Sequence, residues 1–129
     1  VDQNARLNLF GPAKAQEMGI IVKRPIANGA WGAPAAPSSY AARYFERAEQ
    51  MQALGPLPGA PDHRILLALG FAFAHDEVDT FIVGTRSVDH MKANIEWVES
   101  RLPISPQTVE ELQQRFDQFA QPVDWHQLG

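Results

Sequence analysis

Two short runs of apolar, mostly β-branched residues limit what this chain can fold into. The first occupies residues 19–22 and ends in Ile20, Ile21 and Val22, and the second occupies residues 81–83. Neither run alternates apolar with polar residues, a pattern typical of parallel strands that are covered on both faces. Because helical patterns separate the two runs, we predict an α/β fold in which the two strands are parallel.

Helical patterns occupy most of the remaining sequence. We predict helices over residues 8–18, 39–54 and 62–75, a helix that follows Ser87, and a last helix over residues 105–120. Gly19 is the expected stop of the first helix, and Asp62, Ser87 and Ser105 are the expected N-caps of the last three. The expected buried stripes are Tyr40, Tyr44, Ala48 and Met51, then Met91, Ile95 and Val98, and finally Val109, Leu112, Phe116 and Phe119.

Composition excludes several classes of function. Hydrophobic residues make up 45% of the 129 residues and charged residues 20%, so we expect a packed core. The net charge is −4 and the basic residues are scattered, so we expect no nucleic-acid partner. The chain has no cysteine and four dispersed histidines, so we expect no metal site. The longest apolar run, residues 65–74, is too short to cross a bilayer, and we expect a soluble, cytoplasmic protein.

The strongest local signal for chemistry is the segment 81–87, in which a strand ends at a small polar turn before a helix. A turn of this kind aims free backbone N–H groups and the positive end of the helix dipole at an anion. Arg86 adds a planar fork suited to phosphate. His90 and Asn94 lie four residues apart, so they share one face of the helix.

Residues 82–87, with His90 and Asn94, resemble the last strand and the following helix of aldo-keto reductases. Residues 19–29 are similar to the preceding strand and turn of that family. The resemblance implies a partial (β/α)8 TIM barrel, about the last two strand-helix units plus a closing helix. Residues 1–129 would then be the C-terminal part of a single barrel domain.

In aldo-keto reductases these two segments hold the pyrophosphate, the adenosine 2′-phosphate and the adenine of NADPH. The resemblance therefore implies a cofactor site formed by Lys23, Arg24, Pro25, Ile26, Gly84, Thr85, Arg86, Ser87, His90 and Asn94. Lys23 stands where many relatives carry a tyrosine that stacks on the nicotinamide, and Arg24 replaces a small hydroxyl residue. Gly84 and His90 replace a lysine and an arginine of one branch, so Arg86 is the candidate for the 2′-phosphate. We expect NADPH, with NADH as the alternative.

The family's catalytic aspartate, tyrosine, lysine and histidine belong to the first half of the barrel, so we assign no catalytic residue here. The resemblance implies hydride transfer between the nicotinamide and a small carbonyl or alcohol substrate in the complete protein. A different interpretation is a non-catalytic fragment or interaction module that self-associates through exposed strand edges, which a two-stranded sheet leaves unpaired. A third is a phosphate-binding barrel enzyme of another family.

Several residues keep two interpretations. Lys23 and Arg24 either point into the site or stand as solvated turn residues. Trp31, in a loop rich in Gly, Ala and Pro, is a candidate for a lid or wall of the cofactor face. Trp125 and His126 lie in a short tail that either borders a substrate pocket or anchors itself to the barrel.

Overall fold

The computed structural model describes residues 2–120, so Trp125 and His126 lie outside the described residues. The elements, in chain order, are α1 (Asn4–Asn8), α2 (Phe10–Ala15), β1 (Ile21–Lys23), the 3-10 helix η1 (Ala27–Gly29), α3 (Ala42–Gln52), α4 (Arg64–Phe73), β2 (Thr80–Ile82), α5 (Val88–Ser100) and α6 (Pro106–Ala120). This part of the chain is a mixed α/β domain with a two-stranded parallel sheet. The predicted α/β class is confirmed. None of the helices described is long and apolar enough to span a membrane.

The two strands pair as predicted, in parallel. Val22 stands opposite Phe81, and Lys23 stands opposite Ile82. β1 begins two residues later than expected and β2 one residue earlier. The sequence pattern locates an apolar run, but it does not show which residues of the run pair with the neighbouring strand. The parallel register places the loops that follow β1 and β2 side by side at one end of the sheet.

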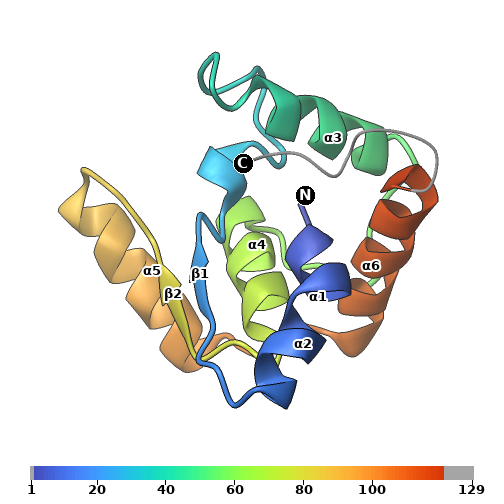
Figure 1. Ribbon diagram of the computed structural model, residues 1–129. Coiled ribbons are helices and arrows are strands. Elements are labelled where there is room, and N and C mark those ends of the chain that lie inside the picture. The colour runs from blue at the N-terminus through green and yellow to red at the C-terminus, as the bar shows by residue number, and fades with distance from the viewer. Residues whose placement is uncertain (1, 121–129) are drawn as a thin grey trace.

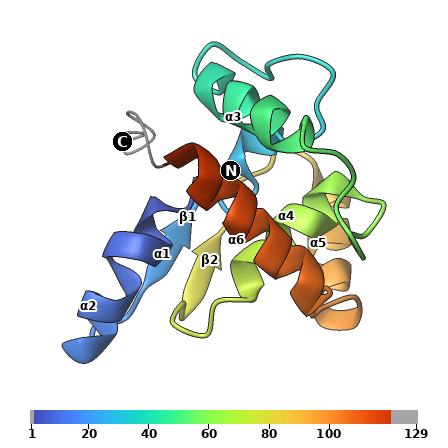
Figure 2. The ribbon, with the colours of Figure 1, turned by 90° about the vertical axis from the view of Figure 1, so that its right-hand side faces the viewer.

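The prediction that both faces of the strands are covered is wrong for the described part of the chain. Ile21 is 64% exposed and Ile82 is 59% exposed, and both point to the same face. The opposite face packs on helices: α4 and α5 lie behind the strands, while α1 and α2 lie beside β1 (Figures 1 and 2). Phe81 stacks on Phe73 of α4 with 4.3 Å between ring centroids. An unbroken apolar run therefore does not establish that both faces are buried.

The first helix was predicted over residues 8–18, but only α2 lies within that range; α1 precedes it, and the two meet at Leu9. The second ends earlier than expected, and Gly19 is not its stop. Instead Glu17 adopts a left-handed backbone with φ of 56°, the Met18 N–H donates to Ala13 O at 3.0 Å, and the Glu17 N–H donates to Lys14 O at 3.0 Å. These two bonds form a Schellman motif. In this motif the chain turns at a left-handed residue, and the N–H groups of that residue and the next bond to the last carbonyls of the helix. The left-handed position of this motif usually favours glycine. Because glutamate fills it here, the sequence does not reveal that the helix ends at this point.

The carboxylate of Asp79 links α2 to Ile20, the residue that precedes β1. The Lys14 ammonium lies 2.9 Å from Asp79 Oδ2, and the same oxygen accepts the Ile20 N–H at 2.7 Å. These two donors, the lysine first, lower the pKa of Asp79 below its ordinary value. The carboxylate therefore helps set the position at which the strand begins.

The main core lies between α3, α4 and α6. Its buried members are Met51, Leu67, Ile104, Leu112, Phe116 and Ala120. The stripe predicted for α6 is confirmed, since Leu112 and Phe116 are buried and Val109 and Phe119 pack against them. Tyr40 does not join the stripe predicted for α3: it is 57% exposed, because the helix begins only at Ala42. Ile95 is 50% exposed, because α5 turns Asn94 inward instead.

The helix N-termini follow the predictions in part. Ser87 caps α5, where its hydroxyl accepts the His90 N–H at 3.2 Å, and α6 begins at Pro106 as expected. Asp62 is not the cap of α4. His63 takes that position, and its Nδ1 accepts the Ile65 N–H at 3.3 Å. The two candidates are neighbours in the sequence, and backbone conformation decides between them.

Polar contacts join the two ends of the described chain, and others hold α6 against the end of α3. The Gln3 side chain donates to Leu112 O at 2.9 Å, and Arg6 forms a 2.6 Å ion pair with Asp117. Arg115 is 3% exposed, and its guanidinium donates to Met51 O, Gly55 O and Pro56 O at 2.7–3.0 Å. One arginine thus satisfies carbonyls at the C-terminus of α3 and in the loop that follows.

Candidate functional site

An open cleft of about 860 Å³ lies where the loops after β1 and β2 leave the sheet, between the N-termini of α4 and α5. It is lined by Lys23, Arg24, Pro25, Ile26, Asn28, Gly29, His63, Arg64, Ile65, Ile82, Val83, Gly84, Thr85, Arg86, His90, Ala93, Asn94 and Trp97. Every predicted cofactor residue except Ser87 is among them. Ser87 lies at the same turn but acts as the N-cap of α5.

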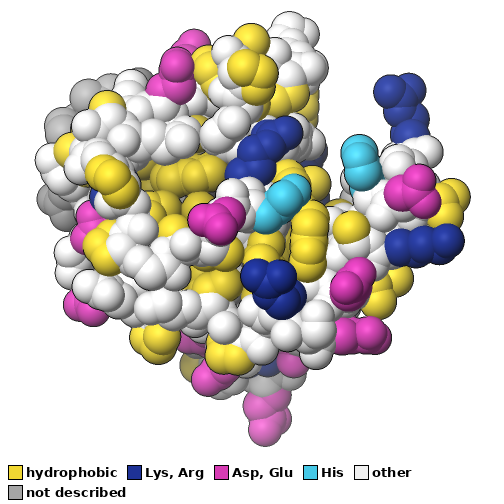
Figure 3. Space-filling view, turned by 180° about the vertical axis from the view of Figure 1, so that it is seen from behind, with side chains coloured by type: hydrophobic (Ala, Val, Ile, Leu, Met, Phe, Trp, Pro, Cys, Tyr) yellow, Lys and Arg dark blue, Asp and Glu magenta, His cyan; other side chains and the backbone are white. Residues whose placement is uncertain are grey.

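The charge of the cleft lining is of one sign. Four cationic residues, Lys23, Arg24, Arg64 and Arg86, line it, and no Asp or Glu is among its lining residues in the described part of the chain. The protein as a whole carries a net charge of −4. Seen from behind, Lys or Arg side chains and histidines stand on both sides of the hollow between α5 and the rest of the molecule (Figure 3). Such a lining favours a ligand with more than one negative charge.

The turn between β2 and α5 is preformed by its own side chains. Thr85 Oγ1 accepts the Ser87 N–H at 3.1 Å, and the Ser87 hydroxyl then caps the helix. The first N–H groups of α5, at Val88 and Asp89, have no partner within the helix. Arg86 is exposed on this turn, and within the described residues its guanidinium makes no hydrogen bond or ion pair. A free arginine fork and free amides thus lie together at the mouth of the cleft.

Asn94 places a side-chain amide in the cleft wall. The residue as a whole is 8% exposed, and its side chain makes no hydrogen bond within the described residues. Its amide is not among the fully buried polar groups that lack a partner, so the amide is accessible from the open cleft. The donor and the acceptor of Asn94 are therefore available to a polar ligand.

Arg24 lines the cleft, and two tyrosines contact its guanidinium. Its Nη1 donates to the Tyr44 hydroxyl at 3.4 Å, and its guanidinium lies 5.0 Å from the centre of the Tyr40 ring. The Tyr44 hydroxyl, above all, raises the pKa of Arg24. Lys23 is exposed at the end of β1 and lines the same cleft. Both residues therefore border the cleft. Arg24 is in addition bound to Tyr44 of α3.

No protein-family model, curated protein or solved structure matches the chain. The resemblance to aldo-keto reductases therefore remains a prediction from residues and their order.

Among the cleft residues that the sequence analysis did not assign to the site are His63, Arg64 and Trp97. The rings of His63 and Trp97 contact each other at a tilt of 44°, with 4.2 Å between their centroids, and Arg64 follows His63 at the start of α4. Trp97 lies three residues after Asn94, so the spacing of His90, Asn94 and Trp97 along α5 is the signal that was available for it. His63 and Arg64 are brought in only by tertiary packing. Trp31, the candidate for a lid or wall, does not line the cleft; it packs against the main core and lines a small pocket together with Leu67 and Leu112.

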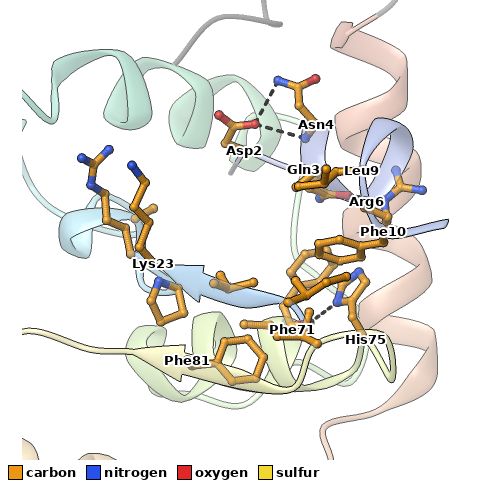
Figure 4. Close-up of a pocket in the computed structure, with 18 of the residues that line it drawn as sticks. Asp2, Gln3, Asn4, Arg6, Leu9, Phe10, Lys23, Phe71, His75 and Phe81 are labelled. Atoms are coloured by element: carbon orange, nitrogen blue, oxygen red, sulfur yellow. Dashed lines mark hydrogen bonds between the residues drawn. The ribbon is translucent and has the colours of Figure 1, made fainter. Parts of the chain in front are cut away.

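A second hollow, of about 360 Å³, runs along the free edge of β1 beside α1 (Figure 4). Phe10, Phe71 and Phe81 form its apolar wall, and Lys23 lies at its end. His75 Nδ1 bonds to Phe71 O at 2.9 Å beside this wall. Neither hollow contains a group of three or more His, Asp or Glu residues placed to hold a metal ion, within the described part of the chain.

Proposed function

We propose that the chain is the cofactor-binding part of an NADPH-dependent oxidoreductase of the aldo-keto reductase type. The observation that carries the proposal is the cleft at the carboxyl ends of two parallel strands, lined by four cationic residues and no carboxylate. In parallel α/β folds, ligands bind at this end of the strands, and phosphate sites of barrels commonly form from the loops after the last two. On this proposal the two strands are the last two of a (β/α)8 barrel in a cytoplasmic protein.

The residues of the cleft fit a dinucleotide. The volume of the cleft lies in the range of cofactor pockets, and the four cationic residues of the cleft match the several negative charges of NADPH. Arg86, with the amides of the α5 N-terminus, would bind the 2′-phosphate. Asn94 offers an unpaired amide to the adenine, and Lys23 to Ile26 would lie along the pyrophosphate. When bound, NADPH supplies the hydride for a carbonyl substrate; the residues of this chain bind and orient it.

Replacing Arg86 with alanine is expected to weaken binding of 2′,5′-ADP by about tenfold, because one charge-assisted contact to phosphate is lost. Binding of 5′-ADP, which lacks the 2′-phosphate, is expected to change by less than about threefold. Isothermal titration calorimetry of NADPH, NADH and the two adenosine phosphates would measure both. Arg101→Ala is the matched control, since Arg101 is exposed at the end of α5 outside the cleft. Equal affinity of wild type and Arg86→Ala for 2′,5′-ADP would remove Arg86 from this role.

A second candidate function is self-association through the sheet, favoured by the exposure of Ile21 and Ile82 and by the open space along the free edge of β1. Two-stranded sheets with apolar, unpaired edges readily add strands. The occupant on this proposal is a second copy of the chain, in place of the first half of a barrel.

Sedimentation velocity over a range of concentrations tests the second candidate. The expected result is a mass that rises with concentration and that falls back to the monomer in Ile21→Lys, because a charge on the exposed strand face opposes burial. Leu7→Lys, a matched change at an exposed leucine of α1, is expected to leave association unchanged. A folded monomer at every concentration would contradict self-association.

A further inference from the structure

We infer that Arg64 is a positioning residue for the anion site, holding the loop after β1 in the shape that borders the cleft. The inference rests on the proposed function, since it assigns Arg64 a part in binding the phosphate-bearing ligand. It differs from the role of Arg86, which contacts the ligand itself. Arg64 is the first residue of α4, on the opposite side of the cleft from α5.

The contacts of Arg64 converge on one short loop. Its Nη1 donates both to Gly29 O and, at 3.3 Å, to Trp31 O. The stem of the same side chain passes beneath Gly32, where an added Cβ would lie 3.5 Å from Arg64 Cδ. Both carbonyls thus accept from one guanidinium nitrogen, a contact that the shorter and more flexible reach of a lysine ammonium reproduces only in part.

The loop held by Arg64 has an unfavourable backbone. Ala27, Asn28 and Gly29 follow one another with φ of 47°, 55° and 75°, all in the left-handed region. Only glycine adopts that region without strain, and such backbone persists where the surrounding structure determines it. Asn28 and Gly29 line the cleft directly, so a relaxed loop would change the cleft wall.

Loss of the Arg64 fork leaves the loop attached at other points. The Gly32 N–H donates to Gln52 Oε1 at 3.3 Å, and Trp31 packs against the main core. Arg64 is itself exposed, so its replacement opens no cavity in the core. A variant such as Arg64→Met, which keeps an apolar stem, is therefore expected to fold and to alter mainly the position of residues 27–29.

The experiment measures binding of 2′,5′-ADP and of inorganic pyrophosphate to wild type, Arg64→Met and Arg64→Lys. The expected result is about tenfold weaker binding for Arg64→Met, partial recovery for Arg64→Lys, and thermal unfolding midpoints that stay close together. Hydrogen exchange without ligand is expected to speed up at the amides of residues 28–31 in Arg64→Met and to recover in Arg64→Lys. Arg101→Met, an exposed arginine outside the cleft, is the matched control.

Hydrogen exchange without ligand separates positioning from direct contact. A residue that only touches the phosphate leaves the unliganded loop as it was, whereas loss of a positioning residue loosens that loop. Arg86→Ala is therefore expected to leave exchange at residues 28–31 as in wild type, and Arg64→Met to speed it up. Unchanged affinity in Arg64→Met, or unchanged exchange at residues 28–31, would overturn the inference alone. Absence of binding by the wild type would overturn the proposed function, and the inference with it.

Discussion

Arg115→Met is expected to lower the free energy of unfolding by about 3–5 kcal/mol, the usual cost of removing one partner from a buried charged network. The substitution keeps much of the volume and removes every donor. Three carbonyls at the end of α3 and beyond it, those of Met51, Gly55 and Pro56, then lose their partner. Glu111, 2.8 Å from Arg115 Nε, is left without its ion pair.

Urea denaturation followed by circular dichroism measures this change, with the slope of the transition checked for a constant value between variants. Arg101→Met is the control, because Arg101 is exposed, and is expected to stay within about 0.5 kcal/mol of wild type. A loss below about 1 kcal/mol for Arg115→Met would mean that water satisfies the three carbonyls as well as the guanidinium does.

Phe116→Ala is expected to cost a similar amount, about 3–5 kcal/mol, through loss of packing instead of hydrogen bonds. Phe116 has no exposed surface and belongs to the cluster that joins α6 to Met51 and Leu67. The same urea experiment, with Ile95→Ala as the control at a half-exposed position, tests it. A change no larger than that of the control would contradict the assignment of Phe116 to the centre of the core.

Periodicity in the sequence predicted elements well where one helix face decides burial, as for Leu112 and Phe116. It also predicted the Ser87 cap, whose hydroxyl acts on a backbone group three residues away. It failed where the deciding group is distant or where backbone conformation selects the residue. Glu17 in place of Gly19 and His63 in place of Asp62 are examples of such selection. The exposed sheet face at Ile21 and Ile82 could not be foreseen, because a run of apolar residues does not say what lies on each side.

The part of the candidate site that lies in the loops after the two strands could be predicted from the sequence. Lys23 directly follows one apolar run, Arg86 lies three residues after the end of the other, and parallel pairing places the two loops together. His63 and Arg64 enter the cleft because α4 packs against α5, which no local pattern reveals. The link between Arg24 and Tyr44 likewise depends on where α3 lies.

The bonds from Gln3 to Leu112 and from Arg6 to Asp117 join residues separated by 109 and 111 positions. Contacts of such long range can form only after the intervening chain has collapsed, since closing a large loop carries an entropic penalty before any contact offsets it. α1 should therefore be among the last elements to dock during folding and among the first to detach. Partial opening at the N-terminus would bare the apolar wall beside β1 while the basic cleft stays intact.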